Sequence, residues 1–268
     1  MKTFRLIKLA VMAIMVSVNL SSCSKDDDPT KNDDGIVIGE KKLVQVTELN
    51  LASEENSSKT FDFSYDSEGR LISITRTYSY DDSDIRTANY IWGNNIIVER
   101  TEDDNTSFNL ENNLVKKIQE SDDDIVSFSY NSSNQLISKQ IDHEYGSTWT
   151  NKYVWDKDRF VSYKYDTQYE TQYTYSGKTC KGYNPLIFPN DFSEGYDLFI
   201  AHPELNGMRS QQLPDKETNN YSDGETHVVD YLYTFDKEGY LETCTMNITN
   251  QYNSNVSTWK IIYTFKWE

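Results

Sequence analysis

The sequence predicts an all-β protein: a large antiparallel meander closed into a barrel or a strongly curved sheet, with one inserted cap. Three observations predict this class. Apolar side chains alternate with polar ones, the alternating segments end in hairpin-type turns, and one aromatic–turn–aliphatic unit recurs along the chain. A sandwich of two β-sheets is the alternative that the same observations allow.

Period-two alternation marks the strands. An aromatic or aliphatic residue occupies every second position, as in a strand with one buried face, in residues 59–65, 125–130 and 229–235. Each segment runs into a turn whose fourth residue is a glycine or an asparagine, namely Gly69, Asn134 and Gly239. These residue types suit the left-handed position of a type I turn followed by a bulge, which closes a hairpin.

The hairpin unit repeats along the chain. Six times an aromatic residue is followed six positions later by an aliphatic one: Tyr65 and Leu71, Trp92 and Val98, Phe108 and Leu114, Tyr130 and Leu136, Trp155 and Val161, Phe235 and Leu241. Up to Trp155 the successive aromatic residues are 16 to 27 positions apart, which is the length of a two-stranded hairpin. We expect about fourteen to sixteen short strands in which neighbours in sequence pair in space.

The N-terminus carries an export signal. Lys2, Arg5 and Lys8 precede an uninterrupted apolar run at residues 9–18, which is the pattern of a secretory signal peptide. A helix of about ten residues is only about 15 Å long, roughly half the hydrocarbon thickness of a bilayer, so the run is too short for a transmembrane span. We therefore expect residues 1–22 to be removed from the mature protein.

The residues after the apolar run resemble a bacterial lipobox. Leu20, Ser21, Ser22 and Cys23 supply an aliphatic residue, two small residues and a cysteine, the pattern that the lipoprotein signal peptidase recognises. The resemblance implies cleavage before Cys23 and attachment of lipid to its thiol, and two or three acyl chains anchor a protein stably to a membrane. The alternative is an ordinary signal peptide with a cysteine nearby by chance.

An acidic segment follows the cysteine. The export signal of Bacteroidota surface lipoproteins is similar to Ser24, Lys25, Asp26, Asp27 and Asp28. The resemblance implies an outer-membrane lipoprotein at the cell surface, with the periplasmic face as the alternative. Residues 23–40 are interpreted as an acidic flexible tether, because they contain too few apolar side chains to fold. The β domain is then 41–268.

The chain is strongly acidic. It has 26 basic and 43 acidic residues and a net charge of −17, and loss of residues 1–22 removes three basic residues and no acidic ones, which leaves −20. Nucleic acid and anionic lipid surfaces bind basic faces, so this charge argues against both as direct partners. The partners that remain are the membrane through the N-terminal lipid, an extracellular glycan and an outer-membrane protein.

Two of the hairpins resemble a known repeat. Residues 65–71 and 235–241 are similar to the YD repeats of Rhs-type proteins, whereas the other units depart from that motif at its Asp, Gly or Arg. The lipobox, the acidic tether and the YD-like hairpins together resemble a Bacteroidota surface lipoprotein family of unknown function with a porin-like fold. That resemblance implies a barrel and supplies no catalytic residue. A membrane-spanning barrel is disfavoured, because charged or polar residues fall where a lipid-facing band would lie.

One stretch interrupts the alternation. Residues 184–216 contain four of the five prolines, and proline cannot donate a ladder hydrogen bond, so we expect an inserted cap with about one helical turn. The aromatic side chains in and beside the cap either close the core over an open end of the sheet or form a ligand platform. These binding candidates are Tyr183, Phe188, Phe192, Tyr196 and Phe199.

Candidate chemistry is sparse. The three histidines have no zinc-binding spacing, the acid clusters match no calcium loop, and no nucleophile or phosphate-loop motif is present. We therefore predict no metal site, no cofactor and no catalytic residue. Cys180 and Cys244 lie in strand-like segments and enter an oxidising compartment after export. A disulfide between them and two free buried thiols are the two alternatives.

Three function classes remain. The favoured class is a non-catalytic binding or scaffold module for a glycan, because Tyr and Trp faces stack on sugar rings and the chain has 20 tyrosines and five tryptophans. The second is a carrier of a lipid or other apolar ligand inside the barrel. The third is a hydrolase with paired carboxylates, whose separation in space the sequence does not give.

Overall fold

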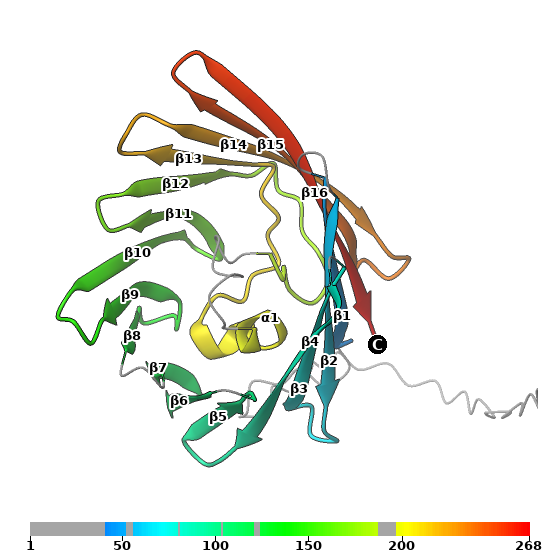
Figure 1. The fold of residues 1–268 in the computed structure, drawn as a ribbon, viewed down its shortest axis with the longest axis vertical. Coiled ribbons are helices and arrows are strands. Elements are labelled where there is room, and N and C mark those ends of the chain that lie inside the picture. The colour runs from blue at the N-terminus through cyan, green and yellow to red at the C-terminus, as the bar shows by residue number, and fades with distance from the viewer. Residues whose placement is uncertain (1–40, 52–55, 80, 103, 121–123, 187–196) are drawn as a thin grey trace, which may run out of the picture. The chain divides into compact units, whose positions relative to one another are not determined.

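Sixteen antiparallel strands, each paired with its neighbours in sequence, form a barrel that the pairing of β1 with β16 closes (Figure 1). The structure is a computed structural model and describes residues 41–51, 56–79, 81–102, 104–120, 124–186 and 197–268. The described strands are β1 (Leu43–Asn50), β2 (Ser57–Tyr65), β3 (Leu71–Tyr78), β4 (Asp81–Trp92), β5 (Ile96–Arg100), β6 (Asn105–Glu111), β7 (Leu114–Gln119), β8 (Ile125–Tyr130), β9 (Leu136–Asp142), β10 (Thr148–Asp156), β11 (Arg159–Tyr165), β12 (Tyr169–Thr174), β13 (Lys216–Tyr221), β14 (Thr226–Phe235), β15 (Leu241–Tyr252) and β16 (Asn255–Trp267). Within these ranges no helix is long and apolar enough to cross a membrane.

The barrel confirms the predicted all-β meander, and the sandwich alternative is wrong. β1 pairs with β2 on one side and with β16 on the other, so the sheet closes on itself instead of ending in edge strands. The predicted turn residues have left-handed backbones, with φ of +85° at Gly69, +60° at Asn134 and +92° at Gly239. A bulge interrupts the strand register beside each of them, as expected for this kind of hairpin.

The two ends of the barrel differ in chemistry. The turns between β2 and β3, β4 and β5, β6 and β7, β8 and β9, β10 and β11, and β14 and β15 lie at one end, which we call the plug end. The long connection between β12 and β13 also starts and ends there. The other eight connections lie at the opposite end, which we call the acidic end. Its described acidic residues include Glu102, Asp104, Asp124, Glu144, Asp166 and Asp223.

The recurring aromatic residues act as latches at the plug end. All even-numbered strands except β6 have, at or near their plug-end terminus, a Tyr or Trp that donates a hydrogen bond to a backbone carbonyl at or beside the start of the preceding strand. The donor–acceptor distances are 2.5–2.8 Å, and the pairs are Tyr65 with Leu43, Trp92 with Leu71, Tyr130 with Val115, Trp155 with Leu136, Tyr175 with Phe160, Tyr233 with Pro214, and Trp267 with Leu241. Each latch joins, at the plug end, two strands that the chain connects only at the acidic end.

The long connection between β12 and β13 lies inside the ring of strands, as Figure 1 shows for its helix α1 (Leu198–Ala201). We call its described residues, 175–186 and 197–215, the plug; they include most of the segment expected as a cap. All four residues of α1 are buried, and the Phe199 ring meets Phe108 and Phe128 edge-on at 5.9 and 6.1 Å. The plug therefore contributes to the core of the barrel.

Backbone contacts fasten the plug to the turns around it. After the 3₁₀ turn η2 (Pro203–Asn206), Gly207 adopts a left-handed conformation with φ of +68°, and its Cα lies so close to the Asn134 carbonyl that a side chain would collide with it. The Ser210 hydroxyl donates to the Asp158 carbonyl at 3.0 Å, and the Lys181 N–H donates to the Gly239 carbonyl at 2.8 Å. Three hairpin turns thus hold the insertion in place.

The inner face of the barrel wall is mostly apolar, and the middle of its outer face is polar. Side chains such as those of Phe61, Ile74, Ile118 and Phe265 are buried on the inner face. Amide and charged side chains are exposed in the middle of the strands on the outer face, among them Asn89, Gln140, Lys152, Lys164, Asp230 and Lys260. Outer-membrane barrels carry an apolar band at that position.

Candidate functional site

A continuous row of aromatic rings lines the inner face of the wall, and we call it the aromatic belt. Neighbouring ring centroids are 4.7–6.0 Å apart, the contact range of stacked and edge-to-face pairs. The belt runs from the end of β9 to β16 through His143, Trp149, Tyr165, Tyr169, Tyr221, His227 and Trp259.

Strand alternation points these rings inward. Five of the belt rings have a buried residue two positions away on the same strand. These buried residues are Asn151, Tyr163, Thr171, Asn219 and Val229. The rings lie beside the turns of the acidic end. Trp149 is six residues from the latch Trp155 on β10, a separation of roughly 20 Å along the strand. The belt and the plug-end latches are therefore separate layers of the barrel interior.

The belt is partly exposed to solvent. Trp149 retains 36% of its accessible surface, and the side chains of His143 and His227 retain 24% and 23%. The remaining belt residues are half-buried. Ring surface is thus available for contact with a ligand.

Carboxylates flank both imidazoles of the belt. Asp124 Oδ2 lies 2.6 Å from His143 Nδ1, and Glu225 Oε1 lies 3.0 Å from His227 Nε2. A backbone hydrogen bond from Glu144 lowers the pKa of Asp124, and the hydrogen bonds from His227 and Asn250 lower the pKa of Glu225. Both groups are ionised acceptors at neutral pH. No group of three or more His, Cys, Asp or Glu side chains that could hold a metal ion occurs among the described residues.

Buried polar atoms without a hydrogen-bond partner gather at the belt. In the described part of the chain these atoms are His143 Nε2, both amide atoms of Asn151, and Asn250 Oδ1. Asn151 follows Trp149 by two positions on β10, and Asn250 pairs in register with His227. Buried polar groups in folded proteins are nearly always paired, so their concentration here marks the belt as the candidate ligand site.

A satisfied polar network lies below the belt on β12, β13 and β14. Tyr231 donates its hydroxyl to Glu217, Asn219 donates its amide to the other oxygen of Glu217 at 2.7 Å, and Thr171 donates its hydroxyl to Asn219. Burial raises the pKa of Glu217. Because its members are paired with one another, this network ties the three strands together beneath the belt.

No protein-family model and no curated protein matches the sequence. Among solved structures, the chain is similar to a porin-like protein from Bacteroides uniformis, with a TM-score of 0.64 and 17% identity over 84% of this chain and 96% of that one. It is also similar to a porin-like protein from Bacteroides vulgatus, with a TM-score of 0.57 and 16% identity over 85% and 99%. The fold is porin-like. At this level of identity the likeness shows the fold alone.

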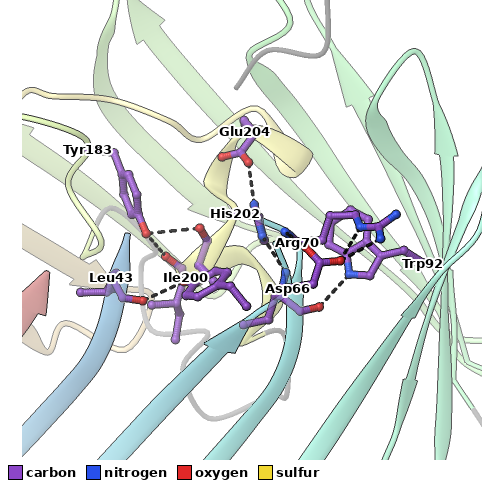
Figure 2. Close-up of polar contacts among 11 residues, drawn as sticks. Leu43, Asp66, Arg70, Trp92, Tyr183, Ile200, His202 and Glu204 are labelled. Atoms are coloured by element: carbon purple, nitrogen blue, oxygen red, sulfur yellow. Dashed lines mark hydrogen bonds and ion pairs between the residues drawn. The ribbon is translucent and has the colours of Figure 1, made fainter. Parts of the chain in front are cut away.

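Two of the predicted binding residues lie in the plug of the porin-like barrel, and Figure 2 shows one of them, Tyr183. Tyr183 is 7% exposed and donates its hydroxyl to the Ile200 carbonyl at 2.9 Å, and Phe199 is 3% exposed. Both side chains fill the core in the described structure. The other three candidates, Phe188, Phe192 and Tyr196, lie outside the described residues.

His202 joins the plug to the wall. The Leu71 N–H donates to Nε2 of the imidazole at 3.3 Å, so the proton of the neutral ring is on Nδ1, which lies 2.8 Å from Glu204 (Figure 2). The ring meets Trp92 edge-on at 5.4 Å, and Trp92 in turn donates to the Leu71 carbonyl. These contacts give His202 a structural role.

A second group of ionisable residues is buried between wall and plug. Arg76 on β3 donates to Asp197 at the start of α1, and Tyr90 donates to Glu99 at 2.7 Å. Burial raises the pKa of Glu99 to about 7 and also raises the pKa of Asp197. The two acids are 6% and 1% exposed. Arg76 and Tyr90 thus hold the two acids between the wall and the plug.

Cys180 and Cys244 are free thiols in the structure, and the expectation of a strand-like segment is wrong for Cys180, which lies outside the strands. Cys180 is in the plug and Cys244 is on β15, and both are buried. Burial raises the pKa of Cys180 to about 12 and raises that of Cys244 as well. Of the two alternatives, the structure has the unpaired thiols, and burial keeps them protonated at neutral pH.

The lipid-attachment and sorting residues lie outside the described residues: Cys23, Ser24, Lys25, Asp26, Asp27 and Asp28. The belt itself was not found by sequence reasoning. Its members come from seven strands or strand ends, and only their shared position beside acidic-end turns could have indicated them.

Proposed function

We propose that the mature protein is a lipid-anchored, non-catalytic module that binds a glycan on the aromatic belt. The observation that carries the proposal is the row of seven partly exposed rings, with centroids 4.7–6.0 Å apart, on one inner face. Aromatic faces stack on the apolar faces of sugar rings, and flanking polar groups bond hydroxyls. A row of rings suits a chain of sugars better than a single one.

The belt fits a glycan better than an apolar ligand. Asp124 and Glu225 place ionised oxygens against it, and a hydrocarbon chain lying there would desolvate both without offering a hydrogen bond. Sugar hydroxyls can donate to these oxygens. The more apolar part of the barrel interior is occupied by the plug, including the buried residues Leu198, Phe199 and Ile200. We therefore place an apolar carrier second.

The proposed anchor is the lipid on Cys23. Support comes from the lipobox-like segment 20–23 and from the exposed polar side chains, such as Gln140, Lys152 and Asp230, in the middle of the outer wall. A barrel with such a wall is attached to a membrane through its terminus instead of by insertion of its strands. The acidic segment 24–28 supports display on the outer membrane, at the cell surface.

A binding assay tests the ligand proposal. The lipidated protein in detergent is titrated with oligosaccharides from a glycan array, and Trp149→Ala is expected to weaken binding by about tenfold or more, since stacking of one aromatic ring contributes roughly 1–2 kcal/mol. Tyr145→Ala is the matched control, because Tyr145 is aromatic, 94% exposed and in the adjacent turn but outside the belt. Equal loss in both variants, or no glycan bound by the wild type, would contradict the proposal.

A labelling experiment tests the anchor. We expect Cys23→Ala to abolish uptake of a fatty-acid probe and to release the protein from the membrane fraction. Cys180→Ala is the control and should label like the wild type, because its thiol is buried in the barrel. Label retained by the Cys23 variant would contradict the lipoprotein assignment.

A further inference from the structure

Asn151 is the most buried polar residue at the belt that has no partner. It is 1% exposed, and neither its amide oxygen nor its amide nitrogen has a hydrogen-bond partner. It lies two positions after Trp149 on the same face of β10 and directly opposite Tyr165 of β11. The centroids of these two rings are 5.9 Å apart, so Asn151 occupies the base of the corner between two rings of the belt.

Leaving this amide unpaired is costly in the folded protein. A buried donor or acceptor without a partner destabilises the folded state, and Asn151 has both kinds of group. An apolar side chain of similar size, such as leucine, would avoid that cost. An unsatisfied amide at a strand position that otherwise faces a core indicates a role that is exercised with a ligand.

The other unpaired atoms lie along the same belt. His143 Nε2 belongs to a belt ring, and Asn250 Oδ1 is beside His227 in the strand register. Lys139, opposite Asn151 on β9, has an interaction of its own in the structure. Unsatisfied polar atoms therefore accompany the rings at three points, as the hydroxyls of a multi-unit ligand would require.

The chemistry of the ligand follows from these groups. An amide can accept a hydrogen bond from one hydroxyl and donate one to the next, so it matches neighbouring hydroxyls on a sugar ring. Asp124 and Glu225 can only accept, and they would repel the carboxylates of an acidic sugar. The acidic residues of the surrounding turns, including Asp166 and Asp223, add to that repulsion.

We infer that Asn151 is a specificity-determining residue that reads neighbouring hydroxyl groups of an uncharged oligosaccharide stacked on Trp149 and Tyr165. The inference rests on the proposed glycan-binding function. The ligand reaches the amide through rotation of Trp149, the most exposed ring of the belt.

Asn151→Leu distinguishes a ligand-binding role of Asn151 from a structural role, because the two roles predict opposite changes in the melting temperature of the unliganded protein. We expect the unliganded variant to melt about 2–4 °C or more above the wild type, since an unsatisfied amide is removed. We expect its affinity for the best-bound neutral probe among maltohexaose, cellohexaose, xylohexaose and mannohexaose to fall about tenfold or more. Asn151→Ala should show the same loss of affinity without the gain in stability. Hexagalacturonate is the acidic probe and should bind more weakly to the wild type than the neutral probe does.

Each of the other outcomes contradicts one specific part of the inference or of the proposed function. If Asn151→Leu binds like the wild type, Asn151 does not determine ligand specificity, although the glycan proposal stands. A lower melting temperature together with weaker binding shows that the amide is structural. Tighter binding of hexagalacturonate overturns the uncharged class, and a wild type that binds none of these probes overturns the inference together with the proposed function for these glycans.

Discussion

Two tryptophans on one strand show how differently the barrel uses aromatic residues at its two ends. Trp155 lies at the plug end of β10, where its indole N–H donates to the Leu136 carbonyl at 2.8 Å. Trp149 lies at the acidic end of β10 on the same inner face, is 36% exposed, and donates no hydrogen bond to a described residue. Trp92 and Trp267 behave like Trp155, whereas Trp259 behaves like Trp149.

The difference distinguishes aromatic residues that stabilise the fold from aromatic residues that are available to a ligand. At the plug end each latch ring has its polar atom bonded to the backbone of the neighbouring strand, so the ring is committed to the fold. At the acidic end the rings contact mainly one another, and the unsatisfied amide of Asn151 lies among them. Amino-acid composition alone cannot distinguish the plug-end rings from the acidic-end rings, whereas the hydrogen-bond partner of each ring can distinguish them.

The largest effect is expected at the junction of plug and wall. Gly207→Val should destabilise the protein by about 3–5 kcal/mol, because valine is strained at φ of +68° and its side chain would collide with the Asn134 carbonyl. Urea unfolding followed by circular dichroism measures this. Gly224→Val is the control, since Gly224 also has a positive φ, of +92°, but no atom within contact distance of a new Cβ. Equal losses in both variants would show that the plug does not press on the wall.

The next effect is a pH dependence of stability. Burial raises the pKa of Glu99 from its ordinary value of 4.5 to about 7, so the folded protein holds a proton that the unfolded chain releases in that range. The free energy of unfolding should therefore fall as the pH rises from about 4.5 to about 7, by on the order of 3 kcal/mol for this group. Glu99→Gln should remove that part of the fall and be the more stable protein at pH 8.

The control for this experiment is Glu144→Gln, which changes the net charge equally at an exposed position of the acidic end. Its pH profile should run parallel to that of the wild type. If Glu99→Gln also runs parallel, then Glu99 ionises in the folded protein as it does in the unfolded chain, and burial between wall and plug does not raise its pKa.

A smaller effect should distinguish the latches from the belt. Trp155→Phe keeps a ring but leaves the Leu136 carbonyl without its donor, so we expect a loss of about 1 kcal/mol, with glycan affinity unchanged. Thermal unfolding and the binding titration measure the two quantities. A loss of affinity without a loss of stability would place Trp155 in the binding site instead.

The smallest change in stability is expected at the belt itself. Trp149→Phe removes no hydrogen bond and leaves a ring at a partly exposed position, so the free energy of unfolding should change by less than about 0.5 kcal/mol. Affinity for the bound oligosaccharide should nevertheless fall, because the smaller ring offers less surface for stacking. A clear destabilisation would show that Trp149 serves the fold as the latches do.

Much of the barrel could be predicted from sequence, because local rules decide it. The alternation in residues 125–130 specifies β8, and the left-handed residues Gly69, Asn134 and Gly239 specify their turns. The strand-register partners of the recurring aromatic residues across their turns follow only partly from the six-residue spacing. Tyr65 pairs with Leu71 across its turn as the six-residue spacing suggests, but Trp92 pairs with Ile97 and Trp155 with Phe160. A bulge or a turn of different length shifts the partner by one residue.

The candidate site could not be predicted, because it depends on contacts between distant residues. His143 and Trp259 end one row of rings although they are far apart in sequence, and only the pairing of β9 to β16 in one curved sheet brings the rings between them into contact. The sequence analysis instead placed the binding candidates in and beside the aromatic-rich insertion. Of its candidates, Tyr183 and Phe199 fill the core. Phe199 contacts Phe108 of the wall, and Tyr183 contacts Trp267 of the wall and donates to Ile200 within the plug.

The even number of strands has a consequence for how the protein is presented. With sixteen strands the first begins and the last ends at the same side of the barrel, and Lys42 and Glu268 exchange backbone hydrogen bonds of 2.6 and 2.9 Å there. This is the plug end. A lipid attached ahead of residue 41 would therefore be joined to the barrel at its latched, filled end, opposite the end that carries the aromatic belt.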